Sequence, residues 1–387
     1  MKLAIVHDAL VNLGGAERVL GSFHLMFPDA PIYTTVYLPD RTHDILQHAK
    51  ITSTWLQNIV GSEGQLKALF PLTYLAMRKL PLSTFDVVLS SSTYCAKNVD
   101  TVAPAIHICY CYAPFRPVWD FDQYTARVGW SWVKRQLMRW FFSAFRRVDF
   151  NAGQKPDYLV AISKHAAAKI ERAYGRRPDA IIYPPVDVTS YSSSEKAEDF
   201  FLVVSRLVAY KKIDLVIRAF TQLKMPLKIV GTGPDLQRLK AIADHNVEFV
   251  GAVSELELRD YYARCRALIF PGIEDFGLTP IEAHASGKPV IALSRGGALE
   301  TVIDASTVES RSATGLFFRQ ETSDAIVKAI RQFDHMTFDS TCIRNRARIF
   351  DITQFRARFC NFVSDVCQGT LQPERWDSTY TTHPVRV

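Results

Sequence analysis

The stretch FPGIEDFGLTPIEAHASGKPVI, residues 270–291, decides the fold of this chain. An apolar run at 267–270 predicts a buried strand, which a Pro-Gly turn ends. A loop carrying Glu274 follows, and then a helix that begins near Pro280 and stops at a glycine before a second strand at 289–292. The stretch therefore predicts a strand–loop–helix unit, which is the repeating unit of a parallel α/β sheet.

The helix of this unit predicts an anion site. A helix that opens at the end of a buried strand points its free N–H groups and the positive end of its dipole beyond the sheet. Glu274 and Glu282 would repel a phosphate, but their carboxylates can accept hydrogen bonds from hydroxyls. A sugar nucleotide, with hydroxyls on both sides of its diphosphate, fits this pattern. The alternative is an ordinary α/β unit with solvated acids, because short motifs often match by chance.

Two longer segments resemble one enzyme family. EDFGLTPIEAHASGKPVIALSRGGALE, residues 274–300, resembles the donor-site signature of the family-4 retaining glycosyltransferases, and VHDALVNLGGAERVL, residues 6–20, resembles the donor-facing loop of that family. The resemblance extends to about residue 335. It implies an α/β protein of the GT-B fold, in which two Rossmann-like parallel-sheet domains face each other across a cleft and the C-terminal helix crosses back.

Composition agrees with a two-domain globular protein. The chain has 387 residues, more than one hydrophobic core usually supports, and 48% of them are hydrophobic. No apolar run approaches membrane-spanning length, and the first residues lack the layout of a signal peptide. The seven cysteines form no C-x-x-C pair, so we expect a reduced, cytoplasmic protein.

The excess positive charge lies in the first half of the chain. Residues 1–183 contain 21 Lys and Arg against 14 Asp and Glu, and residues 184–387 are balanced. Residues 123–148 contain no acid, six basic residues and many aromatic residues. Such a segment can lie on an anionic membrane, which we expect to involve 127–147, or it can be a long core helix with outward-pointing arginines. We expect no nucleic-acid partner.

The α/β rhythm is interrupted once, at IIYPPVD, residues 181–187, which we interpret as the hinge between domains. We predict an acceptor-side domain at 1–183 and a nucleotide-sugar-binding domain at 184–350. The resemblance implies that the helix 351–368 returns to the first domain. Residues 369–387 are predicted to be a flexible tail.

The resemblance assigns catalytic roles to Arg206, Lys211 and Glu274. Lys212, the next residue, is the alternative match to the lysine of the family pattern. Cleavage of a sugar–diphosphate bond leaves new negative charge, which cations and helix N–H groups can stabilise without a metal ion. We therefore expect no cofactor and no metal, only a nucleotide-sugar donor as co-substrate. Glu274 is expected to orient the sugar hydroxyls.

Further residues are predicted to bind the donor through their backbone or side chains, and these are Gly14, Gly15, Gly231, Phe276, Gly277, Leu278 and Glu282. Glu282 is expected to accept hydrogen bonds from the ribose hydroxyls. Tyr112 and Arg116 are expected on the acceptor and sugar side. The family usually has a histidine where this chain has Tyr112, and a tyrosine is no base at neutral pH. Asp120 and Asp122 spell D-x-D, but they suit the start of a helix better than a metal site.

The function implied is retaining sugar transfer. YCYAPFRPVWD, residues 110–120, and PDYLVAISKH, residues 156–165, are similar to bacterial O-antigen and polysaccharide mannosyltransferases. This implies mannose from a GDP-sugar, moved to a glycan or a polyprenyl-diphosphate-linked acceptor at the inner face of the cytoplasmic membrane. The alternatives are a UDP-sugar donor, a glycoside hydrolase with two carboxylates, or a non-catalytic nucleotide-sugar-binding protein. A nicotinamide dehydrogenase is disfavoured, because GTGP at 231–234 is an incomplete dinucleotide fingerprint.

Overall fold

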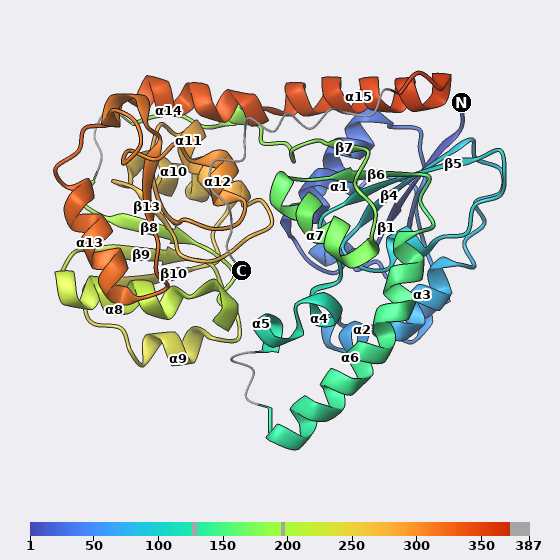
Figure 1. The fold of residues 1–387 in the computed structure, drawn as a ribbon, viewed down its shortest axis with the longest axis horizontal. Coiled ribbons are helices and arrows are strands. Elements are labelled where there is room, and N and C mark those ends of the chain that lie inside the picture. The colour runs from blue at the N-terminus through green and yellow to red at the C-terminus, as the bar shows by residue number, and fades with distance from the viewer. Residues whose placement is uncertain (126–129, 195–197, 372–387) are drawn as a thin grey trace.

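The computed structural model describes residues 1–125, 130–194 and 198–371, and it contains two parallel β-sheets covered by helices (Figure 1). This confirms the predicted α/β fold of two Rossmann-like halves. Arg127 of the basic segment and residues 372–387 of the predicted tail lie outside the described residues. Within the described part of the chain, every helix is too short or too polar to span a bilayer.

The first half is built on a seven-stranded sheet in the order β3-β2-β1-β4-β5-β6-β7. Its strands are β1 (Leu3–His7), β2 (Ile32–Thr34), β3 (Ile51–Ser53), β4 (Val87–Ser92), β5 (Ile106–Cys111), β6 (Tyr158–Ala161) and β7 (Ala180–Ile181). Its helices are α1 (Gly15–Met26), α2 (Glu63–Ala68), α3 (Phe70–Met77), α4 (Arg116–Trp119), α5 (Phe121–Thr125), α6 (Trp132–Gly153) and α7 (Lys164–Tyr174). All neighbouring strands are parallel.

The second half is built on a six-stranded sheet in the order β10-β9-β8-β11-β12-β13, again with parallel neighbours. Its strands are β8 (Phe201–Val204), β9 (Leu227–Val230), β10 (Val247–Gly251), β11 (Leu268–Phe270), β12 (Val290–Leu293) and β13 (Gly315–Phe318). The remaining helices are α8 (Ile213–Leu223), α9 (Leu236–Lys240), α10 (Glu255–Arg264), α11 (Leu278–Ala285), α12 (Ala298–Thr301), α13 (Ser323–Phe333), α14 (Ser340–Ala347) and α15 (Ile352–Gln368).

The strand order of each sheet reverses at one point, between β1 and β4 in the first and between β8 and β11 in the second. Loops that leave adjacent strands on opposite sides of such a point open a crevice at the carboxyl edge of the sheet, where α/β proteins bind ligands. The loop with Gly14 follows β1, Arg206 follows β8, and Glu274 follows β11. Gly14, Arg206 and Glu274 therefore lie in loops that follow strands next to the two reversal points.

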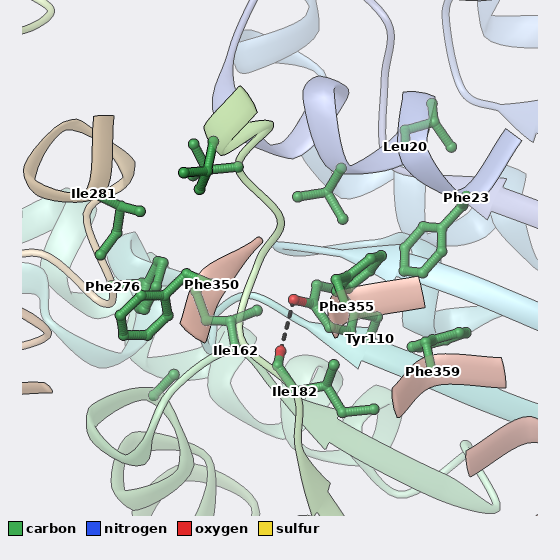
Figure 2. Close-up of a cluster of buried hydrophobic side chains, with 14 of the residues drawn as sticks. Leu20, Phe23, Tyr110, Ile162, Ile182, Phe276, Ile281, Phe350, Phe355 and Phe359 are labelled. Atoms are coloured by element: carbon green, nitrogen blue, oxygen red, sulfur yellow. Dashed lines mark hydrogen bonds between the residues drawn. The ribbon is translucent and has the colours of Figure 1, made fainter. Parts of the chain in front are cut away.

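One hydrophobic core joins the two halves (Figure 2). The ring of Phe276, from the second half, lies 5.5 Å from that of Phe350, just before α15. Farther along, Phe359 of α15 packs 4.8 Å from Phe23 of α1, and all four rings are buried. Because large apolar rings gain most when they leave water together, the halves are held together by apolar packing as well as by charge.

The two connections between the halves lie side by side. Val186 donates its N–H to the carbonyl of Phe350 at 3.0 Å, and Ile352 donates to the carbonyl of Val186 at 3.0 Å. Beyond this crossing, α15 runs along the first half (Figure 1). We propose domain boundaries near 183/184 and 350/351, where the chain crosses in each direction.

Candidate functional site

Charged side chains from both halves meet at the loop after β11. The Lys211 ammonium contacts Oε1 of Glu274, and Arg116 of α4 lies 4.0 Å from Oε2 of the same carboxylate. Lys212 instead pairs with Glu321 at 3.0 Å. The structure thus brings together three predicted residues, Glu274, Lys211 and Arg116, and it places Lys211 rather than Lys212 beside the acid.

Asp275, to which no sequence pattern assigns a role, anchors this loop to the first half. Its carboxylate accepts hydrogen bonds from Arg116 at 2.5 Å and from Lys169 of α7 at 3.1 Å, and its carbonyl accepts from Ser163 at 2.5 Å. Burial alone would raise the pKa of Asp275, but Arg116 and Lys169 lower it below its usual value. Asp275 is therefore an ionised anchor that fixes the backbone next to Glu274.

Arg206 is 51% exposed and lies 3.3 Å from the Glu63 carboxylate of α2, across the two halves. Gly231 supports the loop that carries it, because a Cβ on Gly231 would lie 2.0 Å from the carbonyl oxygen of Ser205. Only a residue without a side chain allows this approach. The structure therefore shows Gly231 as a packing partner of the Arg206 loop.

The N-cap residue of α11 is a glycine. Gly277 has φ +89°, a Cβ on it would lie 2.7 Å from the ring of Phe270, and it has no side chain with which to cap the first turn of the helix. Opposite it, a Cβ on Gly15 would lie 3.1 Å from the Leu278 side chain, so the predicted glycine loop faces the helix N-terminus. Phe276 contributes only backbone here, because its ring is buried in the core between the halves.

Each carboxylate oxygen of Glu282 accepts one hydrogen bond from a protein group. Oε1 accepts a hydrogen bond from Arg18 of α1 at 2.7 Å, and Oε2 accepts one from the Tyr262 hydroxyl at 2.7 Å. The side chain is only 3% exposed. No sequence pattern predicts this role of Arg18. The one signal in the sequence is that Arg18 follows the glycine pair by three residues.

Tyr112 lies beneath the glycine loop. Its hydroxyl donates to the carbonyl of Ala16 at 3.1 Å and lies 2.9 Å from Ser91 Oγ, which in turn is 3.0 Å from Nδ1 of His7. The other ring nitrogen of His7 is 3.9 Å from Oε1 of Glu17, and Oε2 of the same carboxylate accepts the N–H of Gly14. Burial raises the pKa of Tyr112 well above its usual value, so the hydroxyl stays protonated and supports the loop.

The two aspartates of D-x-D are held by basic side chains. Asp120 lies 2.6 Å from Lys169, and Asp122 pairs with Arg139 and, at 3.1 Å, with Arg135. Among residues 1–125, 130–194 and 198–371, no cluster of His, Cys, Asp and Glu has the arrangement of a metal site.

A second carboxylate from the C-terminal half binds the first half. Glu300 accepts the backbone N–H groups of Lys164 and His165 at 2.8 and 2.9 Å, and the hydroxyl of Tyr183 at 3.0 Å. Burial raises the pKa of Glu300. Glu300, from the second half, therefore caps the N-terminus of α7 in the first half. The GGALE stretch around Glu300 does not predict this contact.

Comparison with known proteins places this chain in a family. A family model for glycosyl transferases group 1 matches residues 191–348. The alpha-1,3/1,6-mannosyltransferase ALG2 of Dictyostelium discoideum is 31% identical over 371 residues, which cover 79% of this chain and 85% of that protein. This chain belongs to the group 1 glycosyl transferases.

Two other relatives show how far the similarity extends. The GDP-mannose-dependent alpha-(1-6)-phosphatidylinositol monomannoside mannosyltransferase of Mycolicibacterium smegmatis is 28% identical over 211 residues, which is 46% of this transferase and about half, 53%, of that protein. The crystal structure of Anabaena Alr3699/HepE in complex with UDP and glucose aligns with a TM-score of 0.70 and 19% identity. It covers 94% of this chain and 99% of that chain, and it shows the shared GT-B fold.

Proposed function

We propose that this glycosyltransferase moves mannose or a related sugar from a GDP-sugar to a glycan or a polyprenyl-diphosphate-linked acceptor in bacterial surface polysaccharide synthesis. The observation that carries the proposal is the contact between Lys211 and Glu274 beside the glycine N-cap of α11. The mannosyltransferases among its relatives support the choice of sugar.

In the proposed complex, the donor diphosphate lies against the N–H groups at the start of α11, with Arg206 and Lys211 as cations. Fixed positive charge stabilises the nucleoside diphosphate as it leaves, with no metal ion. Glu274 accepts hydrogen bonds from the sugar hydroxyls once Lys211 turns to the phosphate. The anomeric configuration is retained, with the departing phosphate taking the proton of the incoming hydroxyl on the same face.

Glu282 receives a specific role in this arrangement. One of its oxygens is bonded to Arg18 and the other to Tyr262, so the ribose hydroxyls have to share these oxygens or displace Arg18. A carboxylate oxygen has two lone pairs, and sharing is therefore possible. We propose that Arg18 lies beside the ribose when the donor is bound.

The identity of the donor is tested by thermal shift with GDP-, UDP- and ADP-sugars. A ligand that binds only the native state raises the melting temperature, and about 2.7 kcal/mol of stabilisation is expected at a concentration 100 times the dissociation constant. We expect the largest shift with GDP-mannose. A shift with UDP-sugars alone would replace the GDP proposal, and a shift without release of nucleoside diphosphate would indicate a binding protein.

The diphosphate assignment is tested by Arg206→Ala and Lys211→Ala. Each should lower turnover by about a hundredfold, the usual loss when one preorganised charge donor is removed. Lys212→Asn is the matched control, because Lys212 is the neighbouring cation, pairs with Glu321 and has φ 59°, which asparagine tolerates. Near-parental transfer by both alanine variants would contradict the assignment.

A polyprenyl-diphosphate-linked acceptor is anchored in a membrane. We therefore propose that the enzyme works at the cytoplasmic face of that membrane as a peripheral protein, with residues 127–147 as the contact.

A further inference from the structure

Helix α6 has one face in the core and another that faces solvent. On the inner face Phe142 and Phe145 pack with Phe70 of α3 at ring distances of 5.6 and 5.0 Å, and Asp149 is fully buried. Phe142 and Phe145 belong to the core, as the core-helix alternative predicts, whereas Trp132 and Trp140 are each 74% exposed. Contact with a membrane stays a prediction.

The outer face carries an apolar stripe. Val133, Leu137, Trp140 and Val148 recur at steps of four, three and eight residues, which places them on one side of the helix. Their exposed fractions are 59%, 62%, 74% and 41%, and Trp132 at the first turn is 74% exposed. Single exposed apolar residues are common, whereas several exposed apolar residues on one side of a helix are typical of an interaction surface. We call Trp132, Val133, Leu137, Trp140 and Val148 the α6 stripe.

The arginines of α6 contribute less to a surface contact than their number implies. Arg135 and Arg139 are paired with Asp122, and Arg146 donates to the carbonyl of Val118 at 3.1 Å. Lys134 and Arg147, which are both exposed, have no carboxylate partner among the described residues. Lys134 lies 5.4 Å from the centre of the Trp130 ring. Two basic residues thus flank the apolar stripe.

From this arrangement we infer that the α6 stripe inserts into the interface of a lipid bilayer that contains anionic headgroups. Tryptophan rings prefer the headgroup level, aliphatic side chains lie just below it, and Lys134 and Arg147 can pair with phosphates. A second copy of the chain fits less well, because the excess charge of +7 in residues 1–183 repels a like surface and attracts an anionic one. Figure 1 shows the first turns of α6 projecting beyond the neighbouring helices.

The buried face of α6 connects this surface to the site. Asp149 of α6 accepts a hydrogen bond from Trp119 of α4 at 2.6 Å, and further bonds from Tyr74 at 2.6 Å and Lys97 at 2.8 Å. Arg116, which contacts Glu274 and Asp275, lies on the same single turn as Trp119. A bilayer bound to α6 would therefore hold the site in a fixed orientation to the membrane-anchored acceptor. In this respect the inference rests on the proposed function.

The experiment is flotation of the full chain with vesicles of phosphatidylcholine, and with vesicles that contain an equal share of phosphatidylglycerol. The parent should float with both, and more with the anionic vesicles. Leu137→Glu with Trp140→Glu should lower the bound fraction on both vesicle types by at least about tenfold, because each inserted side chain loses its apolar transfer. Leu256→Glu is the matched control, since Leu256 is 75% exposed on α10 of the other half.

A second pair of variants separates insertion from charge. Lys134→Gln with Arg147→Gln should remove only the additional binding to anionic vesicles, as should about 1 M salt, where the Debye length is about 3 Å. Unchanged thermal melting shows that the variants are folded. The inference is overturned if the parent does not float, if the Leu137 and Trp140 variant floats like the parent, or if sedimentation shows a dimer that this variant dissolves. Because flotation needs no donor, its failure is distinct from a failure of the transferase assay.

Discussion

Two histidines of this enzyme are fully buried and must stay uncharged. Nε2 of His284 lies 3.1 Å from the carbonyl oxygen of Thr314, and Nε2 of His107 lies 2.7 Å from the hydroxyl of Ser90. Burial lowers the pKa of each from 6.5 to about 3. Between these two pH values the unfolded chain binds more protons than the folded one, so stability falls as the pH falls below 6.5.

We expect His284→Gln to reduce the acid sensitivity of the fold. Each buried histidine should cost about 1 kcal/mol of unfolding free energy between about pH 7 and about pH 5.5, and glutamine, which does not titrate, removes one of these contributions. Urea unfolding at several pH values gives the slope. His245→Gln is the control, because His245 is 82% exposed. An unchanged slope for His284→Gln would show that this imidazole binds protons equally well in the folded and the unfolded chain.

At the scale of single elements, α11 depends on the conformation of the residue before it. Gly277 has φ +89° and lies against the ring of Phe270, so an added side chain meets both backbone strain and a collision. As the N-cap residue of α11, Gly277 has no side chain that could cap the first N–H groups of the helix. Its conformation therefore serves the fold and the proposed diphosphate site together.

We expect Gly277→Ala to lower the unfolding free energy by about 3 kcal/mol and to weaken donor binding, because strain and overpacking add. Gly175→Ala is the control for strain alone, since Gly175 has φ +66° and a Cβ there would meet nothing within 4 Å. It should cost only about 1 kcal/mol. Chemical denaturation and thermal shift with GDP-mannose provide the two readouts. Equal losses for the two variants would contradict the collision with Phe270.

A second element-scale prediction concerns α7, whose N-terminus is capped by Glu300 from the other half. We expect Glu300→Gln to cost about 1 kcal/mol, because the amide replaces one accepting oxygen by a donor that faces an N–H group. Glu171→Gln is the control, since Glu171 lies on α7 itself in an exposed pair with Arg177. If both variants melt like the parent, the cap does not contribute to stability.

At the scale of the whole molecule, α15 is the feature that connects the halves. The helix begins beside Phe350, whose ring packs on Phe276 of the second half, and it then places Phe355 and Phe359 against Phe23 of the first half (Figure 2). The charged contacts Arg18–Glu282 and Arg116–Asp275 join the halves nearby. The position of one half on the other therefore depends on the packing of α15 against α1 and on these two ion pairs.

We expect Phe359→Ala to lower the stability of the first half by about 3–5 kcal/mol, the usual cost of removing a buried phenyl ring. Tryptophan fluorescence during urea unfolding reports this half, because five of the six tryptophans lie in residues 1–183. Phe333→Ala is the control, since Phe333 packs in the separate core of the second half against Phe201. A larger shift of the fluorescence transition with the control would contradict this role of α15.

The local patterns of the chain predicted its elements well where the apolar runs were long. The strand–loop–helix–strand unit expected at 267–292 is present as β11, α11 and β12, with α11 beginning at Leu278, two residues before Pro280. Short edge strands such as β3 and β7, with three and two residues, carry too few apolar positions to be distinguished from loops. The long acid-free segment was interpreted as one helix, but the described residues contain α5 and α6 as separate helices.

The amino-acid sequence by itself determined the α/β class, the strand–loop–helix unit around residue 274, and the kinds of residues at the candidate site. These features are accessible because backbone conformation and apolar periodicity are local properties. Only the tertiary structure decided that Lys211 rather than Lys212 meets Glu274, that Arg18 binds Glu282, and that Asp275 and Glu300 bind the first half. These pairs lie 63 to 264 positions apart along the chain. Their partners are set by how two separate sheets pack against each other, which no local pattern records.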